Sequence, residues 1–246
     1  MKRTLFSILA LYFLISPGGV SGGPNASTNE TAPESKPVPA NLGAFLRMHY
    51  VNRTRAFQEQ NQTLRHVVLL GDSITEGFDV ARHFPGHCVN NRGIGGDVIG
   101  NELPADDPRG VLKRLDNSVF QCGATDVFLL IGINDFNGGH AVDAMEQGYR
   151  ELLRRIREGA PAARLHVQSV LPTRGNFARH NAPVRDFNQR LQKLAAEFDC
   201  AYLDLHQRMS DERGELKAEF TNDGLHLTDA AYLAWRDEIR RTLGWK

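Results

Sequence analysis

Short segments that resemble buried strands alternate with amphipathic segments along most of the chain, and this alternation predicts an α/β fold. Strands of a parallel sheet are covered on both faces and read as short apolar runs, whereas helices repeat apolar positions every three to four residues. The predicted strands are 65–73, 88–92, 126–133, 164–171 and 201–205. The predicted helices are 42–64, 74–82, 110–120, 141–158, 184–198 and 229–243. Strands and helices that alternate in this way form a parallel sheet with right-handed crossovers.

The first 41 residues do not follow this alternation, and their composition predicts export. Residues 1–22 combine a basic start, a short apolar run and small residues after Pro17, a pattern typical of a cleaved secretory signal peptide. The apolar run is too short to span a bilayer, so we expect no stable membrane insertion after cleavage. Residues 23–41 are rich in Pro, Ser, Thr and Asn, which predicts a disordered linker. We therefore expect a single domain at 42–246 in a secreted or periplasmic protein.

Composition narrows the possible partners. The chain has 246 residues, 41% of them hydrophobic, which suits one domain with a large core. Its 29 basic and 29 acidic residues leave no basic surplus, so we expect no nucleic-acid partner and a small-molecule or glycan substrate. The oligomeric state stays open. Cys88, Cys122 and Cys200 each precede a predicted strand, and we expect structural roles for them, with a Cys88–Cys122 disulfide left open.

Polar residues follow the predicted strands at the points where they end. The carboxyl ends of parallel strands share one edge of a sheet, where ligands bind in open α/β folds. Side chains far apart in the sequence are therefore expected to converge there. The residues concerned are Ser73 after the first strand, Gly95-Gly96-Asp97 after the second, Asn134-Asp135 after the third, and Asp223 and His226 after the fifth.

These residue types together suit acyl transfer. A serine hydroxyl needs a base to accept its proton, which His226 can do, and Asp223 can hold the histidine in the correct tautomer. The N–H groups of Ser73 and Gly96 and the amide of Asn134 can bind a tetrahedral oxyanion. Taken singly, each feature has a simpler interpretation: Ser73 as a helix cap and the others as turns. Their joint occurrence at one predicted edge favours a catalytic site.

Four short motifs in the chain resemble the signature blocks of the SGNH (GDSL-type) hydrolases, closest to the platelet-activating-factor acetylhydrolase-like branch and to secreted bacterial acetylesterases. The motifs are Gly71-Asp72-Ser73, the block around Gly96, Gly132-Ile133-Asn134-Asp135, and Asp223-Gly224-Leu225-His226. The resemblance implies a flavodoxin-like three-layer α/β/α fold with a five-stranded parallel sheet of order 2-1-3-4-5. It also implies a metal-independent ester hydrolase in which Ser73 is the nucleophile, His226 the base and Asp223 its partner, with Ser73, Gly96 and Asn134 as the oxyanion hole.

Candidate substrate contacts are Asp72, Asp97, Arg174 and Asn176. Residues 98–109 look inserted relative to similar proteins, and the polar loop 172–182 rises from the same predicted edge. The remaining histidines lack paired metal-ligand spacing, so we expect no metal site and no cofactor.

We therefore expect a secreted serine esterase that removes a short acyl group, most simply acetyl, from a carbohydrate hydroxyl. The alternatives are a lysophospholipase or thioesterase that acts on long acyl chains, and a non-catalytic flavodoxin-like binding module.

Overall fold

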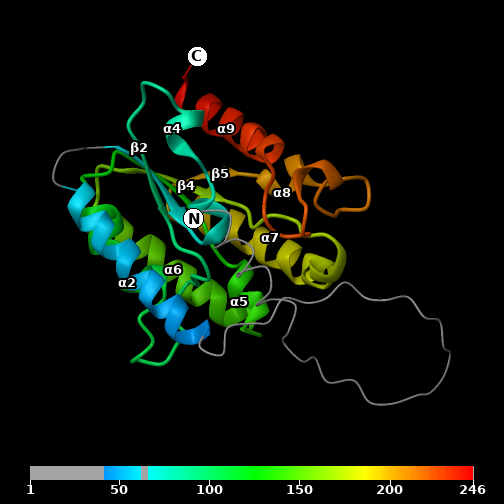
Figure 1. The fold of residues 1–246 in the computed structure, drawn as a ribbon, viewed down its shortest axis with the longest axis horizontal. Helices are drawn as coiled ribbons and strands as arrows, with labels where there is room; N and C mark the ends of the chain where they lie inside the picture. The colour runs from blue at the N-terminus through cyan, green and yellow to red at the C-terminus, as the bar shows by residue number, and fades with distance from the viewer. Residues whose placement is uncertain (1–41, 62–65, 246) are drawn as a thin grey trace.

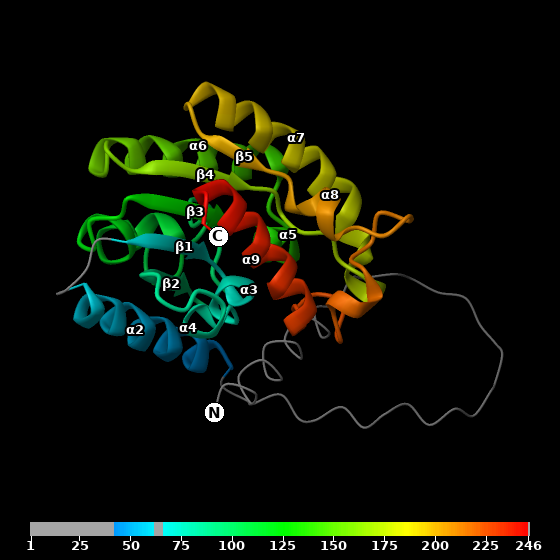
Figure 2. The same ribbon diagram turned by 90° about the horizontal axis from the view of Figure 1, so that it is seen from above.

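Five parallel strands form the central sheet in the order β2-β1-β3-β4-β5, as predicted. The computed structural model describes residues 42–61 and 66–245, so the predicted signal peptide and linker lie outside the described residues. Figure 2 shows the strands side by side in this order. Their bounds are β1 Val67–Gly71, β2 Val89–Gly93, β3 Asp126–Leu130, β4 Arg164–Gln168 and β5 Ala201–Leu203.

Helices cover both faces of the sheet and complete the expected three layers. Helices α2, α6 and α7 lie on one side and α9 lies on the other (Figure 1). The α-helices are α2 Leu42–Gln60, α3 Ser73–Glu76, α4 Val80–His83, α5 Ile133–Asn137, α6 Val142–Gly159, α7 Asn181–Glu197, α8 Leu205–Met209 and α9 Asp229–Leu243. The short turns of other helix types are η1 Val111–Lys113, η2 Asp116–Phe120, η3 Gly175–His180 and η4 Ala218–Phe220.

Strand β1, which leads into the site, lies between β2 and β3 in the sheet. All five of its residues are buried, and Gly71 is level with Gly93 of β2 and Leu130 of β3. A Cβ atom on Gly71 would lie 2.3 Å from the Leu130 carbonyl oxygen, and one on Gly93 would lie 2.1 Å from the Glu76 nitrogen. These glycines therefore let the chain after β1 pack directly on the strand ends.

Two predicted helices are wrong. Residues 74–82 form two short helices, because the first ends at Gly77 and Asp79 caps the second, its carboxylate accepting the Arg82 N–H at 3.3 Å. Residues 110–120 form a 3₁₀ turn and a π-helical turn. The Arg114 side chain, between these turns, is directed into the interior.

Other elements differ at their ends. Strand β3 stops at Leu130, so that the predicted strand end becomes α5, and the loop predicted at 172–182 contains η3 and the start of α7. All three cysteines are free thiols, so the Cys88–Cys122 disulfide is not formed.

Aromatic side chains attach α9 to the sheet. Trp235 is fully buried, packs at a tilt against Phe78 with ring centroids 4.9 Å apart, and donates its indole N–H to Gln168 of β4 at 2.6 Å. Tyr232, one turn earlier, donates its hydroxyl to the Ile74 carbonyl at 2.8 Å. This packing holds the segment before α9 against the start of α3. No helix in the described ranges is long and apolar enough to cross a membrane.

Candidate active site

Ser73 is the first residue of α3, immediately beyond the carboxyl end of β1. The Asp72 carboxylate caps this helix by accepting the Ile74 N–H at 2.9 Å. Only 2% of Ser73 is exposed. As the first helical residue, Ser73 carries an N–H that no carbonyl of its own helix can accept. This end of the helix therefore offers both a hydroxyl and a backbone donor.

His226 contacts the Ser73 hydroxyl from the loop that precedes α9. The distance between Ser73 Oγ and His226 Nε2 is 3.1 Å, and His226 Nδ1 lies 2.7 Å from Asp223 Oδ2. Because the carboxylate fixes the proton on Nδ1, Nε2 is the acceptor that faces the hydroxyl. Residues 153 positions apart in the sequence thus form a continuous hydrogen-bonded chain.

The Asp223 carboxylate is held by its own turn. Its Oδ1 accepts the N–H groups of Leu225 at 2.9 Å and His226 at 2.7 Å. Burial alone would raise the pKa of Asp223, but the hydrogen bond and charge of His226, together with the two N–H groups, lower this pKa to about 2. Asp223 is therefore ionised at neutral pH and can stabilise an imidazolium ion on His226.

Gly96 and Asn134 are the other two predicted oxyanion donors. Gly96 has φ +76°, a conformation that favours glycine, and within the described part of the chain its N–H has no hydrogen-bond acceptor. The Asn134 amide donates to the Asp97 carbonyl at 2.8 Å, which leaves its second N–H available. The neighbouring Gly95 N–H donates to the Glu76 carboxylate at 2.7 Å. Ser73, Gly96 and Asn134 thus come from the ends of three adjacent strands.

Two of the proposed substrate contacts do not face a substrate. Asp72 and Asp97 are both fully buried. Asp72 caps α3, and burial raises its pKa to about 7. Asp97 forms an ion pair with Arg114 at 2.8 Å and accepts the Gly110 N–H at 2.7 Å. The hypothesis that these two carboxylates bind substrate is therefore wrong, because both bond to the protein itself.

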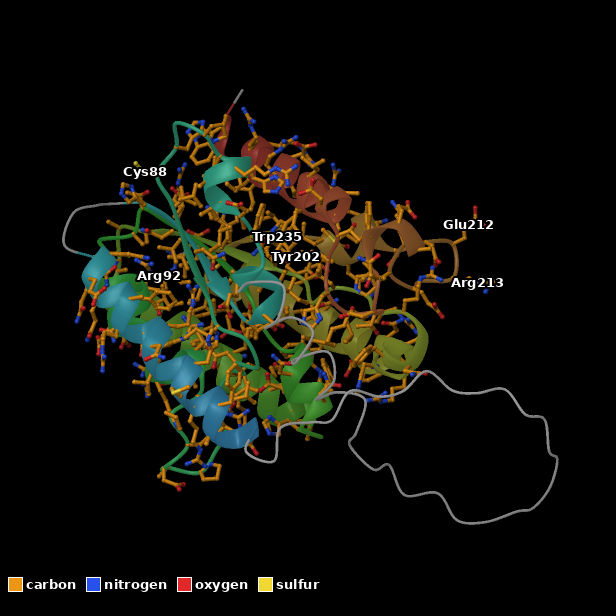
Figure 3. All side chains as sticks on the ribbon, viewed as in Figure 1. Cys88, Arg92, Tyr202, Glu212, Arg213 and Trp235 are labelled. Atoms are coloured by element: carbon orange, nitrogen blue, oxygen red, sulfur yellow. The ribbon has the colours of Figure 1, made fainter. Side chains whose placement is uncertain are left out.

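Arg174 is also occupied within the fold. Its guanidinium donates to the Leu216 carbonyl and the Asp211 carboxylate, which attaches η3 to the loop after α8. Glu212 and Arg213 lie at the protruding end of that loop (Figure 3). A substrate-binding role for Arg174 is not supported by these contacts, whereas Asn176 is exposed on η3.

Sequence reasoning missed two residues that organise this edge. Glu76 accepts the Gly95 N–H and also contacts His49 of α2 at 3.0 Å, and Arg114 bonds to three separate segments. Neither lies in a recognisable motif, and their partners are distant in the sequence. Among residues 42–61 and 66–245, no group of three or more His, Cys, Asp or Glu side chains could hold a metal ion.

Known proteins resemble this chain in sequence and in fold. The platelet-activating factor acetylhydrolase IB subunit alpha1 of Pongo abelii is 27% identical over 220 residues, covering 83% of this chain and 87% of that protein. A Streptococcus pneumonia structure described as a platelet activating factor protein has a TM-score of 0.73 at 24% identity, covering 82% of this chain and 96% of its own.

An acetylxylan esterase from Geobacillus stearothermophilus has a TM-score of 0.57 at 17% identity, covering 73% of this chain and 94% of its own. These structural likenesses show a shared fold. The model of the GDSL-like lipase/acylhydrolase family matches residues 69–234, which include every residue of the serine, histidine and oxyanion arrangement. The chain therefore belongs to the GDSL-like lipase/acylhydrolase family and is an ester-cleaving hydrolase.

Proposed function

We propose that this protein is an exported serine esterase that removes short acyl groups, in particular acetyl, from hydroxyls of a carbohydrate. The observation that carries the catalytic part is the hydrogen-bonded chain from Ser73 through His226 to Asp223. Export rests on the signal-like residues 1–22, and mass spectrometry of the mature amino terminus tests it.

The proposed reaction begins with attack of Ser73 Oγ on the acyl carbonyl carbon. The serine proton passes to His226 Nε2, and the ionised Asp223 stabilises the resulting imidazolium. The oxyanion accepts hydrogen bonds from the N–H groups of Ser73 and Gly96 and from the Asn134 amide. The alcohol leaves with the proton from His226. Water then attacks the acyl-serine, again with His226 as base, and releases the carboxylic acid and free Ser73.

The preference for acetyl is supported by the kinds of relatives found. One sequence relative is named an acetylhydrolase and one structural neighbour is an acetylxylan esterase, so two similar proteins carry names that refer to acetyl groups. The second of these acts on a polysaccharide, as its name states. A carbohydrate ester is therefore the substrate class that we propose for this chain.

Hydrolysis of p-nitrophenyl acetate, octanoate and palmitate, together with acetate release from acetylated xylan, tests this proposal. We expect acetate esters to be preferred and Ser73→Ala to lose about 10⁴-fold or more in kcat. Ser169 is a matched control, because it directly follows β4 but bonds to Asp204 and the His206 N–H instead of a catalytic histidine. Ser169→Ala should keep its kcat.

The other outcomes identify the alternatives. A clear preference for palmitate would contradict the acetylesterase proposal and indicate a lipolytic enzyme. A wild-type protein that is inert with every ester, and that is unchanged by Ser73→Ala, would indicate a binding module.

A further inference from the structure

A buried ion pair lies directly behind the three proposed oxyanion donors. Arg114 and Asp97 bond at 2.8 Å, with 1% and 0% of their side chains exposed. Neither side chain can reach a substrate from this position. The pair therefore requires an explanation other than substrate binding.

The guanidinium of Arg114 connects the ends of two strands. It donates to the Gly71 carbonyl at 2.9 Å, two residues before Ser73, and to the Arg92 carbonyl at 2.9 Å, at the end of β2. It also donates to the Ser118 hydroxyl at 2.9 Å. Four of the five N–H groups of a guanidinium are thus used, which fixes its plane.

Asp97 extends the same network to the other two donors. It directly follows Gly96, and its carbonyl accepts the Asn134 amide at 2.8 Å. Its carboxylate accepts the Gly110 N–H at 2.7 Å as well as the Arg114 Nε–H. The backbone at Gly96 and the amide of Asn134 are therefore both attached to the residue that Arg114 holds.

We infer that Arg114, through Asp97 and the Gly71 carbonyl, is the positioning residue that sets the three oxyanion donors at their mutual distances. This inference rests on the proposed function of the same site. The donors come from three different strand ends, so no single turn can fix their spacing. Oxyanion binding depends on donors that are oriented before the reaction, and a displacement of about 1 Å can cost about 100-fold in rate.

The irregular backbone at 110–120 agrees with this role. A regular helix through these residues was predicted, yet the structure has a 3₁₀ turn and a π-helical turn on either side of Arg114. Arg114 itself has φ −126° and ψ 16°, outside helical geometry. The segment thus forgoes regular helical hydrogen bonds while its arginine reaches the strand ends.

Arg114→Lys and Asp97→Asn in the full chain test this inference. Lysine cannot reproduce the planar fork, and asparagine keeps the volume of Asp97 but removes its charge. With p-nitrophenyl acetate we expect kcat to fall about 100-fold while KM changes less than about threefold, because substrate binding does not use the pair. Affinity for methylboronic acid should fall in parallel, because its serine adduct places an oxygen at the oxyanion position.

A buried carboxylate at the opposite end of the sheet provides the matched control. Asp126 is 2% exposed and contacts His166 at 2.8 Å, far from Ser73 in the fold. Asp126→Asn should lower the melting temperature and leave kcat and boronic acid affinity unchanged. All assays are run below the melting temperature of each variant, and Asp97→Asn carries the test if Arg114→Lys does not fold.

The outcomes separate the inference from the proposed function. A wild-type protein without esterase activity overturns both. Active wild type with unchanged kcat in the folded Arg114 or Asp97 variant overturns only the inference. An equal loss of kcat in Asp126→Asn also overturns it, because the effect would then follow from lost stability alone.

Discussion

Two aspartate–histidine pairs with buried histidines lie at opposite ends of the same sheet, and only one of them contacts a serine. The amino-end pair consists of Asp126, the first residue of β3, and His166 of β4, which are 2.8 Å apart. The carboxyl-end pair consists of Asp223 and His226, which are 2.7 Å apart. By distance and burial the two histidines are nearly equivalent, with 5% and 8% exposed.

What differs is the environment of the second ring nitrogen. His226 Nε2 lies 3.1 Å from Ser73 Oγ, whereas His166 Nδ1 is buried and has no hydrogen-bond partner among the described residues. The His166 ring stacks on Phe128 with centroids 4.2 Å apart. An aspartate–histidine pair therefore does not by itself indicate catalysis. Catalysis becomes possible where the pair lies beyond the carboxyl ends of the strands, because hydroxyl and N–H groups converge there.

Replacing each histidine by glutamine separates these roles and should give the largest contrast. His226→Gln removes the proposed base, so we expect kcat with p-nitrophenyl acetate to fall about 10⁴-fold or more with little change in stability. His166→Gln leaves Asp126 in a buried site with one partner fewer, so we expect lower stability and wild-type kcat. Steady-state kinetics and thermal unfolding of both variants measure the contrast. Comparable activity in the two variants would falsify the assignment of His226 as base.

The same comparison shows what sequence could predict. Three site residues follow predicted strand ends: Ser73, Asn134 and His226. The carboxyl ends of parallel strands share one edge of a sheet, and this alone predicts that the three lie close together. The amino-end pair was not anticipated, because Asp126 and His166 are 40 residues apart and only the register of β3 against β4 brings them together. Long-range register is a property of the folded sheet and leaves no local signal in the sequence.

The errors in the site have the same origin. Asp97 and Arg174 were expected to bind substrate because charged residues near a predicted edge often do. Their partners, Arg114 and Asp211, are 17 and 37 residues away, in segments whose course sequence patterns did not predict. The strand order, in contrast, was predicted correctly from the resemblance to a known family. The motifs that carry this resemblance follow the apolar runs that form the strands.

Two buried asparagines extend the comparison to the oxyanion site. The Asn134 amide donates to the Asp97 carbonyl and keeps an N–H for an oxyanion, whereas both amide atoms of Asn188 bond to Val170, at 2.8 and 2.9 Å. We expect Asn134→Ala to lose about 10² to 10³ in kcat with an almost unchanged KM. Asn188→Ala should instead lose stability, because it leaves two buried backbone groups without partners.

Kinetics on acetate esters and thermal unfolding distinguish the two asparagines. The assignment of Asn134 as an oxyanion donor fails if Asn134→Ala changes KM alone. It also fails if Asn188→Ala, assayed in the folded state, loses as much kcat as Asn134→Ala.

The smallest expected effect is a pH dependence of stability with opposite signs at the two ends of the sheet. Burial raises the pKa of Asp72 from 3.8 to about 7, so between these values the unfolded chain releases a proton that the native state keeps. The contribution of Asp72 to wild-type stability therefore falls as pH rises from about 4 to 7, by up to about 4 kcal/mol. Asp72→Asn removes this loss but buries an amide N–H₂ without a partner, at a cost of about 2 kcal/mol.

The Asp72→Asn variant should thus be about 2 kcal/mol less stable than wild type at pH 4 and about 2 kcal/mol more stable at pH 8. Asp126 behaves oppositely: burial would raise its pKa, but hydrogen bonds from His166 and Arg164 lower it, so its ionised form stabilises the native state and this contribution is lost in acid. Asp126→Asn should therefore be most destabilising at pH 8 and least at pH 3. Urea unfolding across this pH range measures both slopes, and parallel profiles for the two variants would show that the two carboxylates do not differ in their native protonation.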